Sequence, residues 1–412
     1  MEVSAARKSD WLSVAQLAVS SMGVLSLLLA AFGLLTFAVV MGITETSLPE
    51  NMHSIMATSL ACLLFAGLLI PSVVYSLRRL LDKPSSGIMV MNIRVASLAM
   101  IAFPLAVAAG SYLSTQSLAW LFLPPVQLAA VALPLWGIVA FASHRLPAGS
   151  KQRQWGLLAF SLLVSPVFIL MMELVMITLA IALVAVWVGQ QPDLTMRFQV
   201  LFQALSTAEP DLERVMTLVK PLLNEPILAF TGLALVCVLV PLVEEALKSM
   251  ALWMVAKRPL TPAQGFIGGM ICGAGFALLE SLGNLAAPVG ENWLVLILGR
   301  FGTGILHIGT TGLMGWALAQ AWQKSGSWVK LGGVYLAVVV IHGVWNFFGL
   351  LMGFGPLLGG TPLTLPGMLQ PMANIAPIVL IGLAALLLAV MTWTNFHLRS
   401  AAHADDIKLQ LD

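Results

Sequence analysis

The fold is constrained most by a series of apolar runs that are long enough to cross a lipid bilayer. A helix of about 20 residues spans the roughly 30 Å of hydrocarbon, where only helices and closed barrels satisfy every backbone group. Ten such runs lie near 17–43, 54–77, 95–114, 119–143, 156–189, 227–256, 263–285, 293–322, 328–351 and 373–396. Hydrophobic residues make up 59% of the 412 residues and charged residues only 9%. The sequence therefore predicts an all-α, polytopic transmembrane helix bundle of about ten spans.

The distribution of lysine and arginine predicts how these spans are oriented. Cytoplasmic loops of membrane proteins carry an excess of both residues. The short loops 44–53, 115–118, 286–292 and 352–372 hold neither, whereas every alternate short connection holds at least one. Both termini are therefore predicted to be cytoplasmic, in a multi-pass protein of the cell membrane that is in contact with the lipid bilayer. The first run is too long for a signal peptide, and we expect it to remain as a span.

The runs divide the chain into four regions. These are an N-terminal five-span membrane region (1–189), an extracytoplasmic amphipathic segment (190–226), a four-span core (227–351), and a C-terminal span with a short cytoplasmic tail (352–412). Apolar residues in the second region recur at helical spacing, which predicts two amphipathic helices; a packed cap is favoured for them over a substrate gate. The three cysteines fall inside apolar runs, so no disulfide and no cysteine-based zinc site is indicated. No basic stretch interleaved with aromatic residues suggests a nucleic-acid partner.

Ionisable residues inside the spans are few, and most of them lie between 244 and 346. Each costs about 2.5–3.5 kcal/mol at membrane depth on insertion scales, so each needs a structural or functional reason. In the stretch "EEALK", Glu244 and Lys248 stand four residues apart, in the favourable order for an ion pair on one helical face. Glu245 points about 100° away from that face. Glu173, in the fifth span, stands outside this group and is interpreted as a structural carboxyl.

Three further spans each direct polar side chains to one helical face. The residues that share a face are Phe276, Glu280 and Asn284 in the seventh span, Arg300 and His307 in the eighth, and His342 and Asn346 in the ninth. Upstream of Glu280, a stripe formed by Gly265, Gly269 and Gly273 permits close approach of another helix. Because charges in hydrocarbon need partners, we expect these faces and that of "EEALK" to turn toward one another.

This set of side chains suits amide hydrolysis inside the membrane. Carboxylates and imidazoles activate water as a general base, or by holding a metal that acidifies it. A cation and an amide nearby stabilise a developing oxyanion. No HExxH, GxSxG or paired-aspartate motif accompanies them. Two other classes stay open: an ion- or proton-coupled transporter with a relay of Glu173, Glu280 and the two histidines, and a proteolytically inactive membrane scaffold.

Four motifs in this region resemble those of the PrsW-type intramembrane proteases, which are related to the CAAX-processing and bacteriocin-processing membrane proteases. The corresponding stretches are "EEALK" (244–248) for EExxK, "FALLE" (276–280) for FxxxE, Arg300 with His307 for the third polar helix, and "HGVWN" (342–346) for HxxxN. They occur in the family's order on four successive spans. The resemblance covers roughly 226–350, and the first 190 residues lie outside it.

The resemblance implies a membrane-embedded endopeptidase that cleaves a membrane-anchored protein, with 227–351 as its catalytic core. The implied catalytic residues are Glu244, Glu245, Glu280, His342 and Asn346, and the implied supporting residues are Lys248, Arg300, His307 and Asn284. In this assignment Glu245 is the first candidate to contact the reacting water, ahead of Glu244, and Asn346 stabilises the oxyanion. If a metal such as zinc is bound, its implied ligands are Glu280, His307 and His342; otherwise two glutamates act alone.

The sequence departs from the family pattern after Glu280, where Ser281 stands in place of the usual asparagine. The predicted spans also set the depth of each polar residue in the membrane. Straight, upright helices would place Glu280 on the order of 10 Å nearer the outside than His307 and His342.

Overall fold

The computed structural model describes residues 11–44, 52–83, 92–206, 212–223, 225–255, 260–284, 293–323, 327–357 and 369–411. Over these residues the chain is helical and contains no strand. Within them, ten helical stretches are long and apolar enough to cross a membrane, at the places of the ten predicted spans. The predicted all-α, ten-span fold is confirmed. The chain forms two compact units.

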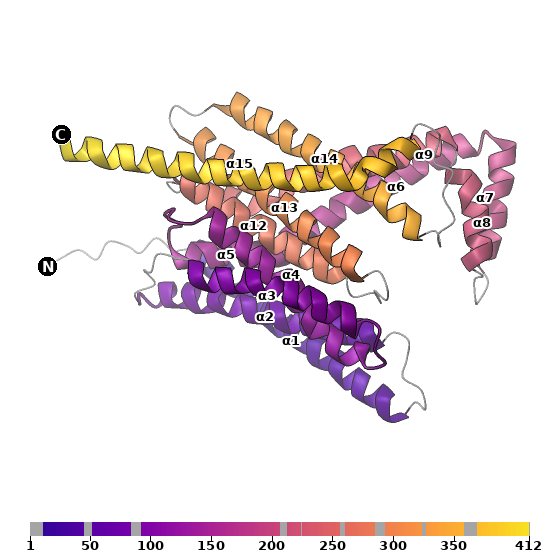
Figure 1. Cartoon of the computed structure of the whole chain (residues 1–412), viewed down its shortest axis with the longest axis horizontal. Helices are drawn as coiled ribbons and strands as arrows, with labels where there is room; N and C mark the ends of the chain where they lie inside the picture. Colours follow the sequence, from indigo (N-terminus) through magenta and orange to yellow (C-terminus); the bar gives the residue numbers. More distant parts are fainter. Residues whose placement is uncertain are drawn as a thin grey trace. The chain divides into compact units, whose positions relative to one another are not determined.

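Unit 1 consists of Met1–Pro166, Lys248–Gly332 and Leu387–Asp412. Its helices are α1 (Trp11–Thr44), α2 (Met52–Leu80), α3 (Ile93–Leu113), α4 (Ala119–Ala142), α5 (Lys151–Leu163), α11 (Met250–Trp253), α12 (Pro262–Asn284), α13 (Trp293–Ala321) and the C-terminal part of α15 (Leu369–Leu411). In Figure 1, α1 to α5 form one group of helices. Of the two later helices, α12 contacts both α4 and α5, and α13 contacts α4.

Uncharged polar side chains join α1, α2 and α5 inside unit 1. The Ser20 hydroxyl donates to Ser72 Oγ at 2.8 Å, and Gln16 Nε2 donates to the same oxygen at 3.0 Å. Gln152 Nε2, on α5, donates to Ser13 Oγ at 2.7 Å. Helices surrounded by lipid gain little from apolar contact, so such hydrogen bonds and close packing hold them together.

The predicted glycine stripe is the contact surface between α12 and α13. A Cβ atom on Gly269 or Gly273 would overlap the backbone carbonyl of Thr311 or His307, and one on Gly265 would overlap the α13 backbone in the same way. The two backbones approach this closely only because these positions carry no side chain. The stripe therefore sets how the polar side chains of α12 meet those of α13.

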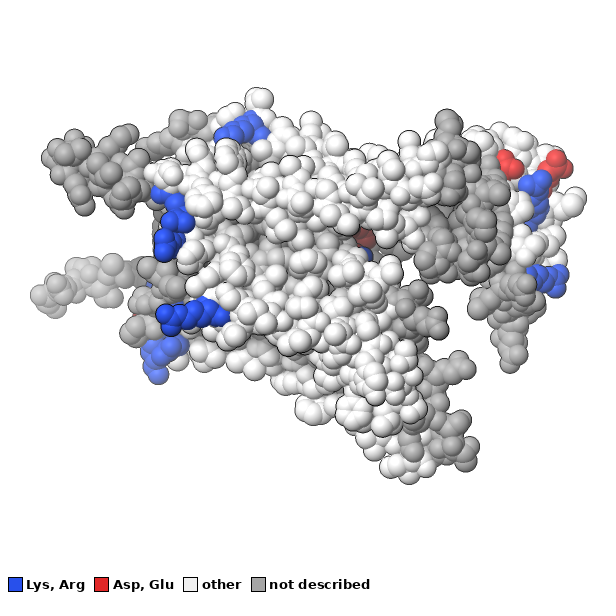
Figure 2. All heavy atoms as spheres, viewed as in Figure 1, with Lys and Arg blue, Asp and Glu red and all other residues white. Residues whose placement is uncertain are grey.

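Charged side chains of unit 1 lie near the ends of its helices. Arg78 and Arg79 are in the last turn of α2, and Lys151 and Arg153 are in the first turn of α5. Figure 2 shows Lys and Arg gathered at one end of this unit, beside a broad band of uncharged residues. Such a band is expected for helices whose middle lies in hydrocarbon. The cytoplasmic position of both termini stays a prediction.

Unit 2 consists of Val167–Leu247 and Gly333–Leu386. Its helices are α7 (Pro192–Leu205), α8 (Leu212–Leu223), α9 (Pro226–Ala234), the π-helix η1 (Leu235–Leu239), most of α6 (Ser165–Val188), α10 (Val240–Lys248) and α14 (Trp328–Leu357), and the first part of α15. The two amphipathic helices predicted within 190–226 are α7 and α8, which contact each other (Figure 1). Val188, Leu194 and Leu222 form the apolar cluster that joins them to the end of α6.

Among the described residues, the helices of two spans are interrupted. The fifth span consists of α5 and α6, which meet at Val164, close to the change from unit 1 to unit 2. The sixth consists of α9, η1, α10 and α11, with η1 inside unit 2 and Pro241 as the second residue of α10. Because α10 is one unbroken helix, Glu244 of unit 2 and Lys248 of unit 1 are one helical turn apart.

Candidate active site

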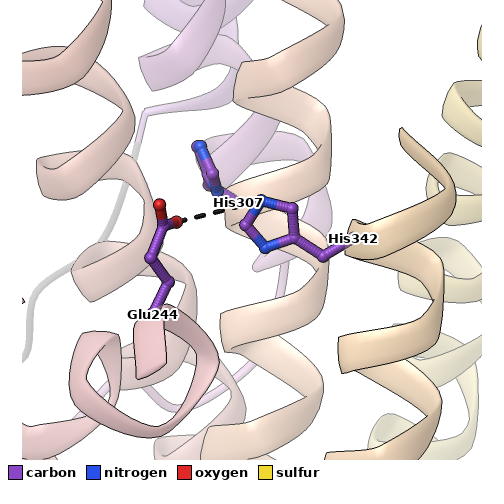
Figure 3. A group of neighbouring side chains, drawn as sticks. All are labelled: Glu244, His307 and His342. Atoms are coloured by element: carbon purple, nitrogen blue, oxygen red, sulfur yellow. Dashed lines mark ion pairs between the residues drawn. The ribbon is translucent and has the colours of Figure 1, made fainter. Parts of the chain in front are cut away.

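In unit 2, α10 and α14 bring two glutamates and a histidine together. The Nδ1 atom of His342 lies 2.7 Å from Glu245 Oε1, and its Nε2 atom lies 3.8 Å from Glu244 Oε2. Figure 3 shows the second pair, with Glu244 on α10 and His342 on α14. The side chains of Glu245 and His342 are buried, whereas that of Glu244 is 12% exposed. The two carboxylates therefore face the two nitrogens of one imidazole.

The distances to the two His342 nitrogens indicate different roles for the two glutamates. At 2.7 Å, the Glu245 carboxylate accepts a hydrogen bond from Nδ1–H of His342 and so leaves Nε2 as the nitrogen with a lone pair. At 3.8 Å, Glu244 Oε2 is beyond hydrogen-bond distance of Nε2. Atoms at this separation are placed to share one water molecule or one metal ion. A carboxylate behind a histidine is also the usual arrangement that orients a metal-binding imidazole.

Two more side chains of α14 bond to the backbone of the sixth span. Asn346 Nδ2 donates to the Val236 carbonyl in η1 at 3.0 Å, and the Tyr335 hydroxyl donates to the Leu242 carbonyl in α10 at 2.6 Å. Tyr335 is not among the predicted site residues. It precedes His342 by seven residues, two turns along the same helical face, and this spacing is the sequence signal that points to it.

In unit 1, four ionisable side chains form a continuous chain of contacts. Lys248 Nζ lies 2.7 Å from His307 Nδ1, and His307 Nε2 lies 2.9 Å from Glu280 Oε2. Arg300 completes the chain with an ion pair of 3.2 Å to Glu280 Oε1. A protonated lysine only donates, so His307 accepts at Nδ1 and donates from Nε2 to Glu280. Two cations and an imidazole thus surround one carboxylate.

The aromatic ring of the FxxxE motif packs against this chain of contacts. The Lys248 ammonium lies 4.6 Å from the centre of the Phe276 ring. The same ring meets the His307 imidazole edge to face, with 5.1 Å between the centroids. A cation above an aromatic face is stabilised by the ring's electrons when it is removed from water. Phe276 therefore supports the buried position of Lys248.

Glu280 and His307 are in direct contact, so the separation that straight, upright helices would give does not occur. Their side chains are hydrogen-bonded at 2.9 Å, whereas straight, upright helices would separate them by about 10 Å. The glycine contact between α12 and α13 ends at Gly273, which lies against the His307 backbone and precedes Glu280 by two helical turns. Close packing of the two helices thus brings Glu280 within reach of His307.

Two other predicted residues lie apart from these contacts. Asn284 is the last residue of α12 and is exposed, so its supporting role stays a prediction. Glu173 lies on α6 in unit 2 and is half-buried.

The donors in unit 2 fit a divalent metal such as zinc. A carboxylate oxygen of Glu244 and Nε2 of His342 are ligand types that zinc binds, and Glu245 occupies the outer position on Nδ1. A hydrolytic zinc site uses three protein ligands and one water. Of the ligands implied by the sequence, only His342 belongs to unit 2. Glu280 and His307 belong to unit 1, where they bond each other.

These features first define a class: a multi-pass membrane protein with carboxylates, imidazoles and a lysine buried on three of its spans and a half-buried carboxylate on a fourth. The chain belongs to the PrsW family. The family model described as "PrsW family intramembrane metalloprotease" matches residues 153–380, more than half of the chain, including α10, α12, α13 and α14. The family match supports an intramembrane protease that acts on a protein substrate in the membrane. No curated protein and no solved structure matches the chain.

Proposed function

We propose that this chain is an endopeptidase that hydrolyses a peptide bond of a membrane-anchored protein at the cell membrane, with water activated by Glu244 beside His342. The observation that carries the proposal is the arrangement of Glu244, Glu245 and His342 on α10 and α14. Glu244 accepts a proton as the water oxygen bonds to the substrate carbonyl carbon. It returns that proton to the amine nitrogen as the C–N bond breaks.

The contacts favour Glu244 over Glu245 as the general base, in contrast to the first choice from the sequence. Glu245 is fully buried and accepts a hydrogen bond from His342. Glu244 keeps some exposure, so water and substrate reach it more readily. In this proposal Glu245 orients the imidazole, and Glu244 touches the reacting water.

Lys248 supplies the positive charge near the developing oxyanion. One N–H of Asn346, the residue given this role by the family resemblance, already donates to the Val236 carbonyl. Lys248 has three N–H donors and lies on the same helix as Glu244, one turn further on. Preorganised donors of this kind stabilise transition-state charge strongly where water is excluded.

In this proposal Lys248 acts together with Glu244 and Glu245. The reason is α10, a single helix that carries Glu244 and Glu245 of one group and Lys248 of the other. Residues four apart on a helix have Cβ atoms about 5–6 Å apart, so covalent geometry keeps these charges together. Glu280 and Arg300 then support Lys248 through His307.

The family description names a metalloprotease, and the donors described above are compatible with that type. We propose Nε2 of His342 as one ligand of such a metal, with Glu245 orienting the imidazole and Glu244 kept as the general base. When bound, zinc would acidify water and polarise the substrate carbonyl.

Co-expression with a tagged single-span substrate tests the proposed function. His342→Ala is expected to abolish the cleavage product, while His397→Ala, on α15 outside the family match, keeps it at the wild-type level. Both variants are compared at equal amounts in the membrane. Cleavage at the wild-type rate by His342→Ala would contradict the proposal, as would ion uptake without cleavage by the wild-type chain in proteoliposomes.

A further inference from the structure

The acidic helix α10 follows a π-helical segment, and a proline stands at the junction. Residues Leu235–Leu239 form η1, and the Val240 N–H donates to the Leu235 carbonyl, five residues back. Pro241 comes next and has no N–H. Single π-helical turns inside α-helices are rare and occur frequently at functional sites.

The proline leaves backbone carbonyls without their usual donor. In an α-helix the residue 241 N–H would serve the Cys237 carbonyl, and in a π-helix it would serve the Val236 carbonyl. The α-helical donor for Val236 is the Val240 N–H, which already serves Leu235. Val236 therefore lacks both regular backbone donors. A backbone carbonyl within a membrane needs a partner, and side chains of neighbouring helices supply one next to proline.

Asn346 supplies that partner. Its Nδ2 atom donates to the Val236 carbonyl at 3.0 Å. One turn earlier on α14, the position of Gly343 has no side chain, and a Cβ there would overlap the Cys237 carbonyl. Two residues of the HxxxN stretch thus meet the two carbonyls that Pro241 affects.

Tyr335 makes a second connection on the other side of the proline. Its hydroxyl donates to the Leu242 carbonyl at 2.6 Å. His342, which contacts Glu244 and Glu245, lies between Tyr335 and Asn346 along α14. The two backbone contacts therefore bracket the histidine and fix its register against the two glutamates.

We infer that Asn346 and Tyr335 are positioning residues, which hold the backbone on both sides of Pro241 so that Glu244 and Glu245 meet His342. The inference rests on the proposed function for its consequence in catalysis. It gives Asn346 a role on the enzyme's own backbone in place of a contact with the substrate oxyanion. A displacement of about 1 Å in such a group costs on the order of 100-fold in rate.

A double-mutant cycle between Asn346 and Pro241 tests this inference. Asn346→Leu removes the donor at similar size, and Pro241→Ala restores a backbone N–H. With alanine at 241, Val236 gains a backbone donor in either geometry: the Val240 N–H in an α-helix or the residue 241 N–H in a π-helix. The carbonyl then no longer depends on Asn346, so the effects of the two changes are coupled.

Two quantities are measured for each variant of the cycle: hydrogen exchange of peptides covering 235–248 and the rate of substrate cleavage. Asn346→Leu alone is expected to speed exchange in this segment about three- to tenfold. It also lowers kcat about 10–100-fold, with KM within about twofold. In the Pro241→Ala background, the same change is expected to leave exchange unaltered. An oxyanion contact would instead lower kcat by the same factor in both backgrounds and leave exchange at the wild-type rate, which would overturn the inference.

Tyr335→Phe is a second test of the inference, because it removes only the hydroxyl that donates to the Leu242 carbonyl. It is expected to speed exchange in 235–248 about twofold or more and to lower kcat, whereas Tyr112→Phe, at an exposed position on α3, changes neither. Unchanged exchange in both Tyr335→Phe and Asn346→Leu would overturn the inference. Exchange reports on the backbone independently of cleavage, so a wild-type chain that cleaves nothing contradicts the proposed function alone.

Discussion

The polar groups of the two units differ in charge balance and in how their contacts are arranged. In unit 1, one carboxylate is surrounded by a lysine, an arginine and a histidine, with 2.7–3.2 Å between successive members. In unit 2, two carboxylates face a single imidazole, and one of these contacts is 3.8 Å long. The first group carries an excess of positive charge and the second an excess of negative charge.

Hydrolysis of an amide requires both kinds of charge, negative and positive. A base that takes a proton from water, or a pair of ligands that holds a metal cation, benefits from excess negative charge. A developing oxyanion benefits from fixed positive charge. We therefore interpret the group of Glu244, Glu245 and His342 as the source of the reactive carboxylate.

Of the changes considered, removal of a bound metal is expected to have the largest effect on cleavage. A chelator should abolish cleavage by the purified protein, and added zinc should restore it. Metal analysis should find about one ion per chain in the wild type and in Arg300→Gln, and none in His342→Ala. Active protein that contains no metal and resists chelators would show that the glutamates act without one.

Substitutions of the two glutamates of unit 2 should lower kcat to different extents, which tests the separate roles proposed for them. Glu244→Gln is expected to lower kcat about 100- to 10,000-fold, since it removes the general base. Glu245→Gln is expected to lower it only about 10–100-fold, because a glutamine oxygen still accepts from His342. Initial rates in liposomes check both, and Glu225→Gln, outside these contacts, is the matched control. The reverse order would move the reactive role to Glu245.

In unit 1, removal of the single carboxylate is expected to affect stability first. Glu280→Gln removes the carboxylate that Arg300 and His307 contact and should lower the free energy of unfolding by about 1–3 kcal/mol. The double variant Glu280→Gln with Arg300→Gln should recover part of that loss, because one of the two cations is removed as well. Thermal unfolding in detergent measures both. Equal stability of Glu280→Gln and the wild type would contradict the balance of charge described for this unit.

An effect of similar size, on stability alone, is expected at the glycine contact that positions the unit 1 group. Gly273→Ala would overlap the His307 carbonyl and should cost about 1–3 kcal/mol in stability. Gly283→Ala, on the same helix with open space around it, should change stability by less than about 0.5 kcal/mol. The difference between their unfolding temperatures measures how tightly α12 and α13 pack. Similar temperatures for both variants would contradict the close contact.

The sequence predicts the spans well because membrane insertion depends on local composition. Ten apolar runs become ten candidate spans, since each run needs no knowledge of its neighbours to meet the length requirement. The polar residues were also identifiable, because each ionisable group in hydrocarbon stands out from its surroundings. The glycine stripe was predicted for the same reason, since its spacing is visible within one helix.

The geometry between helices was less predictable from sequence. The contact of Glu280 with His307 depends on how α12 and α13 cross, and straight helices give the wrong depth. The proposed roles of Glu244 and Glu245 depend on the rotation of α10 against α14, which sets their distances to His342. The role of Tyr335 depends on a backbone carbonyl, which no side-chain pattern reveals.

Pro241 also has a consequence for the order in which the protein is assembled. The chain is synthesised from its N-terminus, so α10 is made about a hundred residues before Asn346 of α14. Until the ninth span enters the membrane, neither His342 nor the Asn346 donor for the Val236 carbonyl is available. The acidic helix is therefore completed late, and the growing chain passes through the membrane machinery before it is able to cleave proteins.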